Sequence, residues 1–352
     1  MNTTTLPAGE LIDQRGRAEL EFLQSLRVGL APLRNRIRAT VQESGTLETP
    51  FAGIEDLRQR VDGVLADNAD HRIVGAVLRW SRQVATPRAV AAFERRRDVL
   101  APLAAPAGVV VDAGENPPRY WDYEFHATAG GWDGHPDMGF VHHEMIYHFL
   151  LKKIYPGDLF AQRRQVAAAA PRDDYERIVD MGCGTGQYTL QLAQVYPQAS
   201  ITAVDLSRTQ ARYALRRAED AGVAITAVHA NAEATGLPDG CADLVTAFIL
   251  HHELPPHATR NTFTEAFRLL EPGGHVHFSD VAPYDRRSPY QAWLDDWDAE
   301  HGNEPWWRTA ATLDLEAAAR AAGFVDVRQQ ALGADAYPWV ITATKPTQEQ
   351  PS

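Results

Sequence analysis

The sequence predicts an α/β protein with a doubly wound, mostly parallel seven-stranded sheet whose last strand is antiparallel, preceded by an N-terminal helical domain. Two observations predict it. From Arg177 onward, short β-branched runs alternate with helical patterns, which is typical of a parallel sheet covered on both faces. Before about residue 100, apolar residues instead recur at steps of three and four, which indicates amphipathic helices.

Residues 1–110 form the expected N-terminal helical region. Pro32 is expected to divide its first apolar run, and Pro87 to open a later helix, because proline is tolerated best in the first turn of a helix. The charged faces are expected to be solvated helix surfaces. These helices could also form an acceptor wall or a homodimer interface, and the sequence does not choose between the two. The first run consists of Leu20, Leu23, Leu26, Leu30, Leu33, Ile37 and Val41.

Residues 111–174 are expected to be a linker and a lid. The stretch "LAPLAAPAGVVVDAGENPP", which leads into this region, is rich in Pro, Ala and Gly, as domain edges are. Next, "RYWDYEFHATAGGWDGHPDMGF" gathers aromatic residues and histidines around Gly130 and Gly131, a pair suited to a hinge. The alternative to a lid is aromatic packing between the helical region and the sheet.

Residues 175–346 contain the expected sheet. Helical patterns separate its first strands, whereas the last two lack a helix between them and are expected to form an antiparallel hairpin. An insertion at 283–310 follows the fifth strand. The strands lie in "RIVDMG", "SITAVDLS", "AITAVHAN", "ADLVTAFIL", "GHVHFSDV", "FVDVRQQAL" and "PWVITATK".

Composition limits the function. The net charge of -12 disfavours nucleic-acid and anionic-membrane partners, which require basic patches. Two cysteines exclude a disulfide scaffold and a thiolate zinc site. We see neither a signal peptide nor an apolar run of about 18 residues, so no membrane span and a cytoplasmic location are expected.

The stretch "IVDMGCGTGQ", residues 178–187, is the most informative motif. A triphosphate-binding loop requires a lysine that is missing here. A dinucleotide fingerprint requires a third glycine where Gln187 stands. A tight turn without a ligand requires fewer glycines. What remains is the pattern apolar–apolar–Asp–x–Gly–x–Gly–x–Gly.

This pattern resembles the first motif of class I S-adenosylmethionine-dependent methyltransferases, which have a Rossmann-like fold. "ITAVDLS", "HANAEATGLPDGCADLVTAFILHHELP" and "EAFRLLEPGGHVHFSD" resemble the segments that follow it in that family. The resemblance covers about residues 175–345, and the subtype is similar to the small-molecule methyltransferases of ubiquinone and menaquinone biosynthesis. It implies S-adenosyl-L-methionine as the cofactor.

The resemblance also implies which residues contact that cofactor. Asp180 can accept from the ammonium group, while amides at the next helix N-terminus can meet the carboxylate. Asp205 can hold both ribose hydroxyls, because a carboxylate accepts two hydrogen bonds at once. Asn231 replaces the Asp usual in the family, but an amide can still accept from the adenine amino group. The full set is Asp180, Gly182, Cys183, Gly184, Thr185, Gly186, Asp205, Leu206, Asn231, Ala232, Glu233, Phe248 and His251.

Three residues are candidates for catalysis. His252 and Glu253 follow the fourth strand at the carboxyl edge of the sheet, where ligands bind in open α/β sheets. Histidine titrates near neutrality and could take a proton from the acceptor. His126 in the lid is the third candidate. The alternative is that the paired histidines only pack near the cofactor.

No metal is expected. "HHEMIYH" and "HELPPH" each have one residue more than the zinc motif H-E-x-x-H. On an α-helix, five residues turn about 500°, which leaves the two histidines about 140° apart. Two prolines also exclude a regular helix from the second stretch.

The acceptor is expected between the lid and the insertion. Tyr120 and Tyr123 are the candidates in the lid, and Trp293, Trp297 and Trp306 are those in the insertion. Aromatic faces beside carboxylates suit a cation or an amine-bearing ring. The alternative is an amphipathic helix with its tryptophans turned inward.

The sequence therefore predicts methyl transfer from S-adenosylmethionine to a small-molecule acceptor, through an O, N, S or C nucleophile, in specialised or cofactor biosynthesis. Two alternatives stay open. One is a cyclase or rearrangement enzyme that uses the bound sulfonium only as a charge. The other is a non-catalytic module that binds the cofactor.

Overall fold

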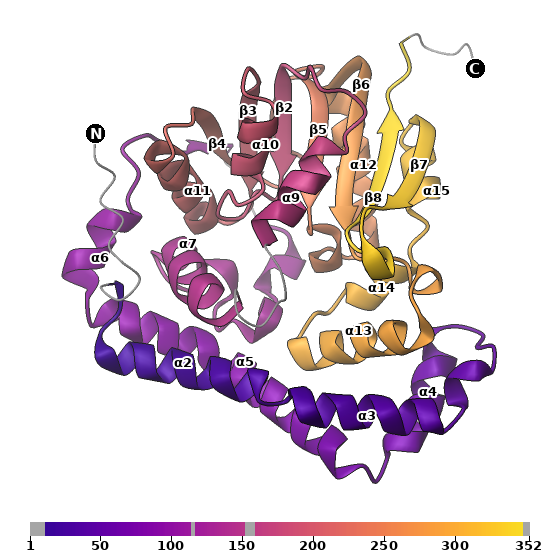
Figure 1. Cartoon of the computed structure of the whole chain (residues 1–352). Coiled ribbons are helices and arrows are strands. Elements are labelled where there is room, and N and C mark those ends of the chain that lie inside the picture. Colours follow the sequence, from indigo (N-terminus) through magenta and orange to yellow (C-terminus); the bar gives the residue numbers. More distant parts are fainter. Residues whose placement is uncertain (1–10, 114–116, 152–158, 348–352) are drawn as a thin grey trace.

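The computed structural model describes residues 11–113, 117–151 and 159–347 (Figure 1). Its sheet has the order β1-β4-β3-β2-β5-β6-β8-β7, and all neighbours are parallel except those of β8, which runs antiparallel to both β6 and β7. The strands are β1 (Val111–Asp112), β2 (Arg177–Met181), β3 (Ser200–Asp205), β4 (Ile225–His229), β5 (Ala242–Phe248), β6 (Leu270–Asp280), β7 (Val325–Ala331) and β8 (Trp339–Thr344).

The predicted fold class is confirmed, with one difference in the strand count. The expected seven strands become eight because β1, a two-residue strand from the expected linker, extends the edge beside β4. The C-terminal antiparallel hairpin is formed by β7 and β8, as predicted.

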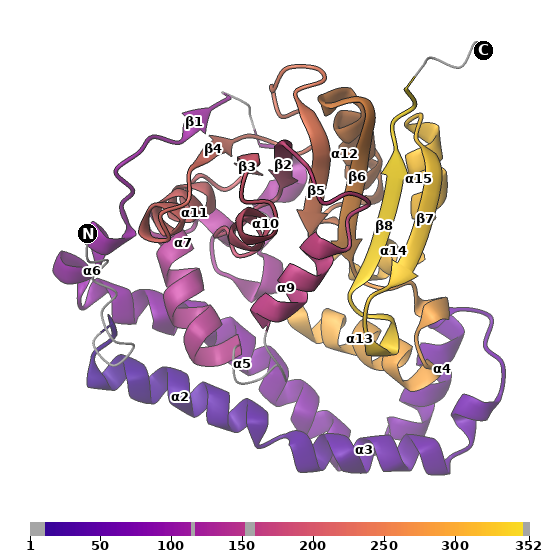
Figure 2. The same cartoon turned by 45° about the horizontal axis from the view of Figure 1, so that its top comes forward.

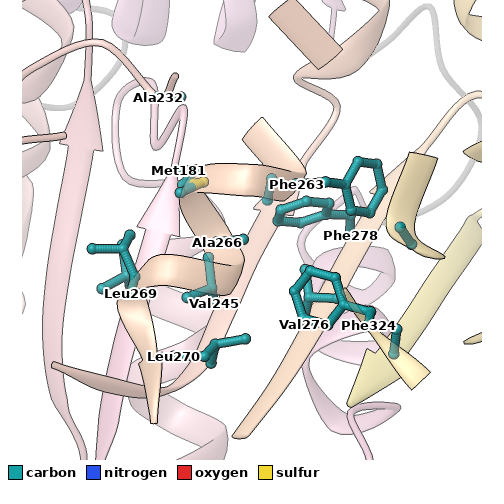
Figure 3. Close-up of a cluster of buried hydrophobic side chains, with 14 of the residues drawn as sticks. Met181, Ala232, Val245, Phe263, Ala266, Leu269, Leu270, Val276, Phe278 and Phe324 are labelled. Carbon is teal, nitrogen blue, oxygen red and sulfur yellow. The ribbon is translucent and has the colours of Figure 1, made fainter. Parts of the chain in front are cut away.

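Helices cover both faces of the sheet, as a doubly wound sheet requires. α9 (Leu159–Ala168), α10 (Thr189–Val195) and α11 (Arg208–Asp220) lie on one face, and α12 (Pro256–Leu269) and α15 (Leu315–Ala321) on the other (Figure 1). Figure 3 shows the core under α12, where the rings of Phe263 and Phe278 pack against each other in a cluster that also contains Val245 and Leu269.

The N-terminal region is helical, as expected. It comprises α2 (Gln14–Val28), α3 (Ala31–Glu43), the short helix η1 (Thr46–Glu48), α4 (Ile54–Leu65), α5 (Ala69–Glu94) and α6 (Arg97–Ala104). Pro32 lies in the first turn of α3, at the predicted division. The prediction for Pro87 is wrong, because this residue lies inside α5. The lost hydrogen bond is tolerated there because Ala89, Ala92 and Phe93 bury the following turns.

A middle layer separates these helices from the carboxyl edge of the sheet (Figures 1 and 2). The expected lid supplies η2 (Arg119–Asp122), η3 (Phe125–Ala127), η4 (Gly131–Asp133), α7 (Met138–Phe140) and the π-helix η5 (Val141–Leu151). The expected insertion supplies η7 (Tyr284–Arg286), α13 (Pro289–Gly302) and α14 (Trp307–Thr312). The remaining short helices are η6 (His251–Glu253) and η8 (Ala334–Ala336).

Two apolar clusters join the middle layer to the N-terminal helices. In one, Trp293 and Trp297 of α13 pack among Leu57, Val61 and Val74 of α4 and α5. In the other, η5 packs against α2 and α5. Among the described residues, no helix combines the length and the apolar character needed to cross a membrane.

Candidate active site

The expected site residues follow the carboxyl ends of β2, β3, β4 and β5, and the middle layer lies across this edge (Figure 2). The strand order reverses here, since the chain proceeds from β2 to β3 and β4 on one side and continues with β5 and β6 on the other. In open α/β sheets, such a switch point is where ligands bind.

The glycine loop after β2 leaves space at its middle residue. Gly182, Gly184 and Gly186 have φ angles of +67°, +52° and +73°, in the left-handed region that glycine adopts without strain. A Cβ atom at Gly182 would lie 2.7 Å from Leu250, and one at Gly186 would lie 3.1 Å from Ala214. At Gly184 it would meet no described atom within 4 Å, so the backbone there borders open space.

Asp180, at the end of β2, has an unsatisfied oxygen. Its side chain is fully buried, and Oδ2 accepts a 2.6 Å hydrogen bond from Thr189 Oγ1. Oδ1 has no hydrogen-bond partner among the described residues. Burial raises the pKa of this carboxyl to about 7. A buried acceptor of this kind calls for a donor from a ligand.

Asp205, at the end of β3, is fixed by the backbone. Its carboxylate accepts from the amides of Gly184 and Ser207, at 2.7 and 2.8 Å. Burial raises its pKa to about 7, although both amide hydrogen bonds oppose that change. Asp205 therefore ties the glycine loop to the β3 edge and retains free lone pairs. The carbonyl of the next residue, Leu206, lies 3.0 Å from His229 Nε2.

The segment after β4 contacts the lid. Asn231 Oδ1 accepts from the amide of Glu233 at 2.9 Å. The carboxylate of Glu233 accepts from the Tyr120 hydroxyl at 2.5 Å and from Asn261 Nδ2 at 2.7 Å. Ala232 between them is buried. Glu233 is thus engaged by the protein, and its contact with Tyr120 holds η2 over this end of the edge.

The lid is held at two further points. Trp132 Nε1 donates to Glu253 Oε2 at 3.1 Å. The Ser207 hydroxyl, which also caps α11, donates to Asp133 Oδ1 at 2.7 Å. The lid therefore spans the edge from the β3 side to the β5 side.

His252 forms a pair with an acid that the sequence did not single out. Its Nδ1 lies 2.9 Å from Asp280 Oδ1, at the end of β6, and Asp280 Oδ2 accepts from the amide of His251. Burial opposes the charged imidazole, but Asp280, with smaller contributions from Glu304 and Glu253, raises the pKa of His252 to about 9. Asp280 could have been found, because it ends a neighbouring strand at the same edge.

His126, the third candidate for catalysis, lies between two acids. Its Nε2 lies 3.1 Å from Glu253 Oε1, and its Nδ1 contacts Glu304 Oε1. Burial opposes the charge, yet the two carboxylates raise the pKa of His126 to about 10. At neutral pH this residue is an imidazolium between two anions.

Two predicted cofactor contacts lie in the cores instead. The ring of His251 stacks on Phe263 and meets Phe278 edge-on, at 5.7 and 4.9 Å between centroids. Phe248 packs beside Tyr188 and under the guanidinium of Arg163, which lies 4.7 Å from the ring centre. Phe248 ends β5, where alternate side chains point to the covered faces of the sheet, and His251 begins the short helix η6 that follows.

The residues expected to bind the acceptor lie in two different places. Trp306 lies with Tyr120, Tyr123 and Phe125 of the lid, with centroid distances of 5.6 to 5.8 Å. Trp293 and Trp297 do not join them: they are 1% and 3% exposed, in the core between α13 and the N-terminal helices. The prediction that these two bind the acceptor is corrected, since buried rings offer no free face. The positions of Trp293 and Trp297 agree with the alternative, an amphipathic helix whose tryptophans are turned inward.

Residues under the glycine loop were missed by the sequence analysis. Arg217 Nη1 donates to the carbonyl of Thr185 at 2.6 Å, and His143 Nδ1 lies 3.1 Å from the Thr185 hydroxyl. Arg217 belongs to no motif, and His143 lies in "HHEMIYH", which was compared only with a zinc motif. Cys183 is buried beside them, and burial raises the pKa of its thiol.

The "HHEMIYH" stretch differs from the expected geometry. It lies in a π-helix, whose hydrogen bonds join residues five apart, so His143 and His148 stand together with 4.9 Å between ring centroids. The 140° separation expected on an α-helix does not apply. Within the described ranges, no group of three or more His, Cys, Asp or Glu side chains is arranged to hold a metal.

Comparison with known proteins bears on this site. Residues 178–274 match a family described as a methyltransferase domain. A trans-aconitate 2-methyltransferase from Azoarcus sp. is 34% identical over 36% of this chain and 47% of its own. A demethylmenaquinone methyltransferase from Thermus thermophilus is 30% identical over 37% of this chain and 57% of its own. The chain thus spans about half the length of these relatives.

A solved structure is also similar. Phosphoethanolamine N-methyltransferase 2 of Haemonchus contortus, in complex with S-adenosyl-L-methionine, is 17% identical, with a TM-score of 0.43 over 60% of this chain and 58% of its own.

Proposed function

We propose that this chain, which carries a class I S-adenosylmethionine-dependent methyltransferase domain, transfers a methyl group to a hydroxyl of a small-molecule acceptor. The observation that carries the proposal is Asp180 Oδ1, a buried carboxylate oxygen without a described partner at the floor of the glycine loop. An ammonium group is the donor that such an oxygen best accommodates.

The described residues fit S-adenosylmethionine. Asp180 would hold its ammonium group, and amides at the start of α10 would meet its carboxylate. The open side of Gly184 gives room for close approach of the backbone. Asp205, already oriented by two amides, would accept from the ribose hydroxyls. Asn231 and Ala232 would border the adenine. When bound, the cofactor supplies an activated methyl group on a sulfonium.

His252 is the base in this proposal, and Asp280 is its positioning residue. Asp280 fixes the tautomer and orientation of the imidazole through Nδ1, which leaves Nε2 for the acceptor. Trp307 flanks the ring at 5.2 Å between centroids, so an aryl or alkyl acceptor has an apolar surface beside the base. An oxygen nucleophile requires proton removal, and this buried pair supplies it.

Calorimetry with S-adenosylhomocysteine tests the cofactor site. The wild-type protein is expected to bind it, and Asp205→Asn to weaken binding at least about tenfold, because a hydrogen bond to a charged group is lost. Asp243→Asn is the matched control. Asp243 is also a buried acid that accepts from two backbone amides, those of Glu176 and Arg177, but it lies at the other end of the sheet. Equal losses in both variants, or no heat with the wild type, would contradict the proposal.

An assay for S-adenosylhomocysteine release tests the reaction. A candidate acceptor should yield one equivalent of demethylated cofactor with each methylated product. A rearranged product formed without cofactor consumption would instead support the cyclase alternative, and a protein that binds the cofactor but consumes none with any acceptor would support the binding module.

A further inference from the structure

Glu304 is a buried anion with an unused oxygen. It follows α13, and its side chain is 6% exposed. Oε1 contacts His126 Nδ1 and lies 3.6 Å from Arg82 Nη1. Oε2 has no hydrogen-bond partner among the described residues. His126 and Arg82 hold the pKa of Glu304 below its usual range despite burial, so the group stays ionised.

Glu304 lies beside the proposed reaction site. His126 joins it to Glu253 of η6, the residue next to His252. Three residues further on, Trp307 packs against His252, and between them Trp306 meets the aromatic residues of the lid. Glu304 is therefore enclosed by the lid, η6 and the junction of α13 and α14, the segments that border the acceptor side of the edge.

An unsatisfied ionised oxygen in this position is costly. Leaving a charged acceptor without a donor costs more free energy than leaving a neutral one, because the charged group loses more hydration when it is buried. His126 and Arg82 both lie on the Oε1 side of Glu304. His252 also favours the ionised form of Glu304, but no described residue donates a hydrogen bond to Oε2. A buried acceptor without a partner calls for a donor, and at the border of a site a ligand group can supply it.

We propose that Glu304 recognises the acceptor: its Oε2 accepts a hydrogen bond from an ammonium or hydroxyl group that the acceptor carries in addition to the hydroxyl that is methylated. This inference rests on the proposed function and adds a substrate class to it. Acceptors with a second donor fit the site, and acceptors with a carboxylate there do not.

The local charge supports this class. Glu253 and Glu304 are balanced by His126 and Arg82, and Asp280 by His252 when its ring is protonated. When His252 is neutral and ready to act as the base, the group has a net negative charge. A cationic or neutral donor is then favoured over an anion.

The test uses protein saturated with S-adenosylhomocysteine and four phenols that differ in one substituent. Tyramine carries an ammonium group, tyrosol a hydroxyl, para-ethylphenol neither, and phloretate a carboxylate. Calorimetry is run on the wild type, on Glu304→Gln and on Glu300→Gln. Glu300 is the matched control, an acid of α13, the helix that Glu304 follows; it is 63% exposed and pairs with Arg58 outside the site.

We expect tyramine and tyrosol to bind the wild type in the millimolar range or tighter, about tenfold better than para-ethylphenol, with phloretate weakest. Glu304→Gln should remove the preference and leave the affinity for S-adenosylhomocysteine unchanged, whereas Glu300→Gln should change neither. If Glu304→Gln does not fold, the order of the four phenol affinities in the wild type still tests whether the site prefers a second donor group.

Three results would overturn the inference while leaving the cofactor proposal intact, provided that S-adenosylhomocysteine itself gives heat: phloretate binding as tightly as tyramine, no advantage of either donor over para-ethylphenol, or no phenol binding at millimolar concentration. Absence of heat with S-adenosylhomocysteine would instead contradict the proposed function.

Discussion

Gly184 differs from Gly182 and Gly186 because the space that its Cβ atom would occupy is free. Gly184→Ala is expected to weaken S-adenosylhomocysteine binding at least about tenfold, because the methyl group would enter the space that the ligand requires. The strain of a left-handed alanine, of order 1 kcal/mol, comes in addition. Gly222→Ala isolates that strain, since Gly222 follows α11 with a φ of +68° and also has no described atom near its Cβ position. Calorimetry and thermal unfolding of both variants separate the two effects. Similar cofactor affinity in both would contradict the assignment of Gly184.

The His252–Asp280 pair sets the pH dependence. The pKa of His252 is raised from 6.5 to about 9, so the fraction of neutral base increases as the pH rises toward 9. We expect kcat/KM to rise over this range, and Asp280→Asn to move the rise about one to two pH units lower with a reduced maximum. The same pair also affects stability, because the folded state binds the His252 proton more tightly than the unfolded state does. This contribution to the free energy of unfolding is complete below pH 6.5 and is lost as the pH rises past 9. A pH–rate profile that Asp280→Asn does not change would contradict the role of His252.

Among single residues, those that belong to a local motif could be predicted from the sequence. Asp180 lies at the end of one strand, Gly184 follows that strand, and Asp205 ends the next strand along the chain, so their spacing brings them to one edge. Glu304 could not be predicted, because its place depends on how the insertion folds against the lid. His126 was named as a candidate, but its contacts with Glu253 and Glu304 could not be predicted, because both acids are distant from it in sequence.

Among the elements, α7 packs so closely on α11 that its position depends on a glycine. A Cβ at Gly139 would lie 2.3 Å from the carbonyl oxygen of Thr209 and 2.7 Å from Tyr213 Cβ, both on α11. Gly139→Ala is expected to cost about 2 kcal/mol or more of unfolding free energy, because backbone must move. Gly63→Ala, in α4 with open space around its Cβ position, should instead stabilise by up to about 1 kcal/mol. Urea titrations give the free energy of unfolding of both variants. Equal changes in the two would contradict the close packing of α7 on α11.

The strands of the sheet were predictable because alternation and length are local signals. Three elements were not. β1 has only two residues and pairs through its backbone. η5 is a π-helix, a form that no periodicity of the sequence announces. Pro87 sits inside α5 because burial of the following turns outweighs the usual preference.

On the scale of the whole molecule, the N-terminal helices and the insertion share one core. Removal of residues 1–104 would expose Trp293 and Trp297, each worth several kcal/mol when buried. We expect the truncated chain to bind a hydrophobic dye, to show red-shifted tryptophan emission and to lose cooperative unfolding. Cooperative unfolding with unchanged cofactor affinity would show that the helices are dispensable. The domain boundaries at about 110 and 175 and a homodimer through these helices stay predictions. Neither could be derived from amphipathic patterns, which do not say what covers an apolar face.

The contact between Tyr120 and Glu233 bears on the order in which the cofactor binds and its demethylated form is released. The expected lid, which carries Tyr120, also contacts Glu253 and Ser207, so we expect a molecule bound beneath it to leave only after these hydrogen bonds break. The cofactor would enter first, and departure of its spent form would limit turnover. Tyr120→Phe should speed that departure about tenfold in stopped-flow measurements, and Tyr123→Phe, which loses a bond to Asn303 only, should not. A burst of product before the steady state would then report the residence time of the demethylated cofactor rather than the rate of the chemistry.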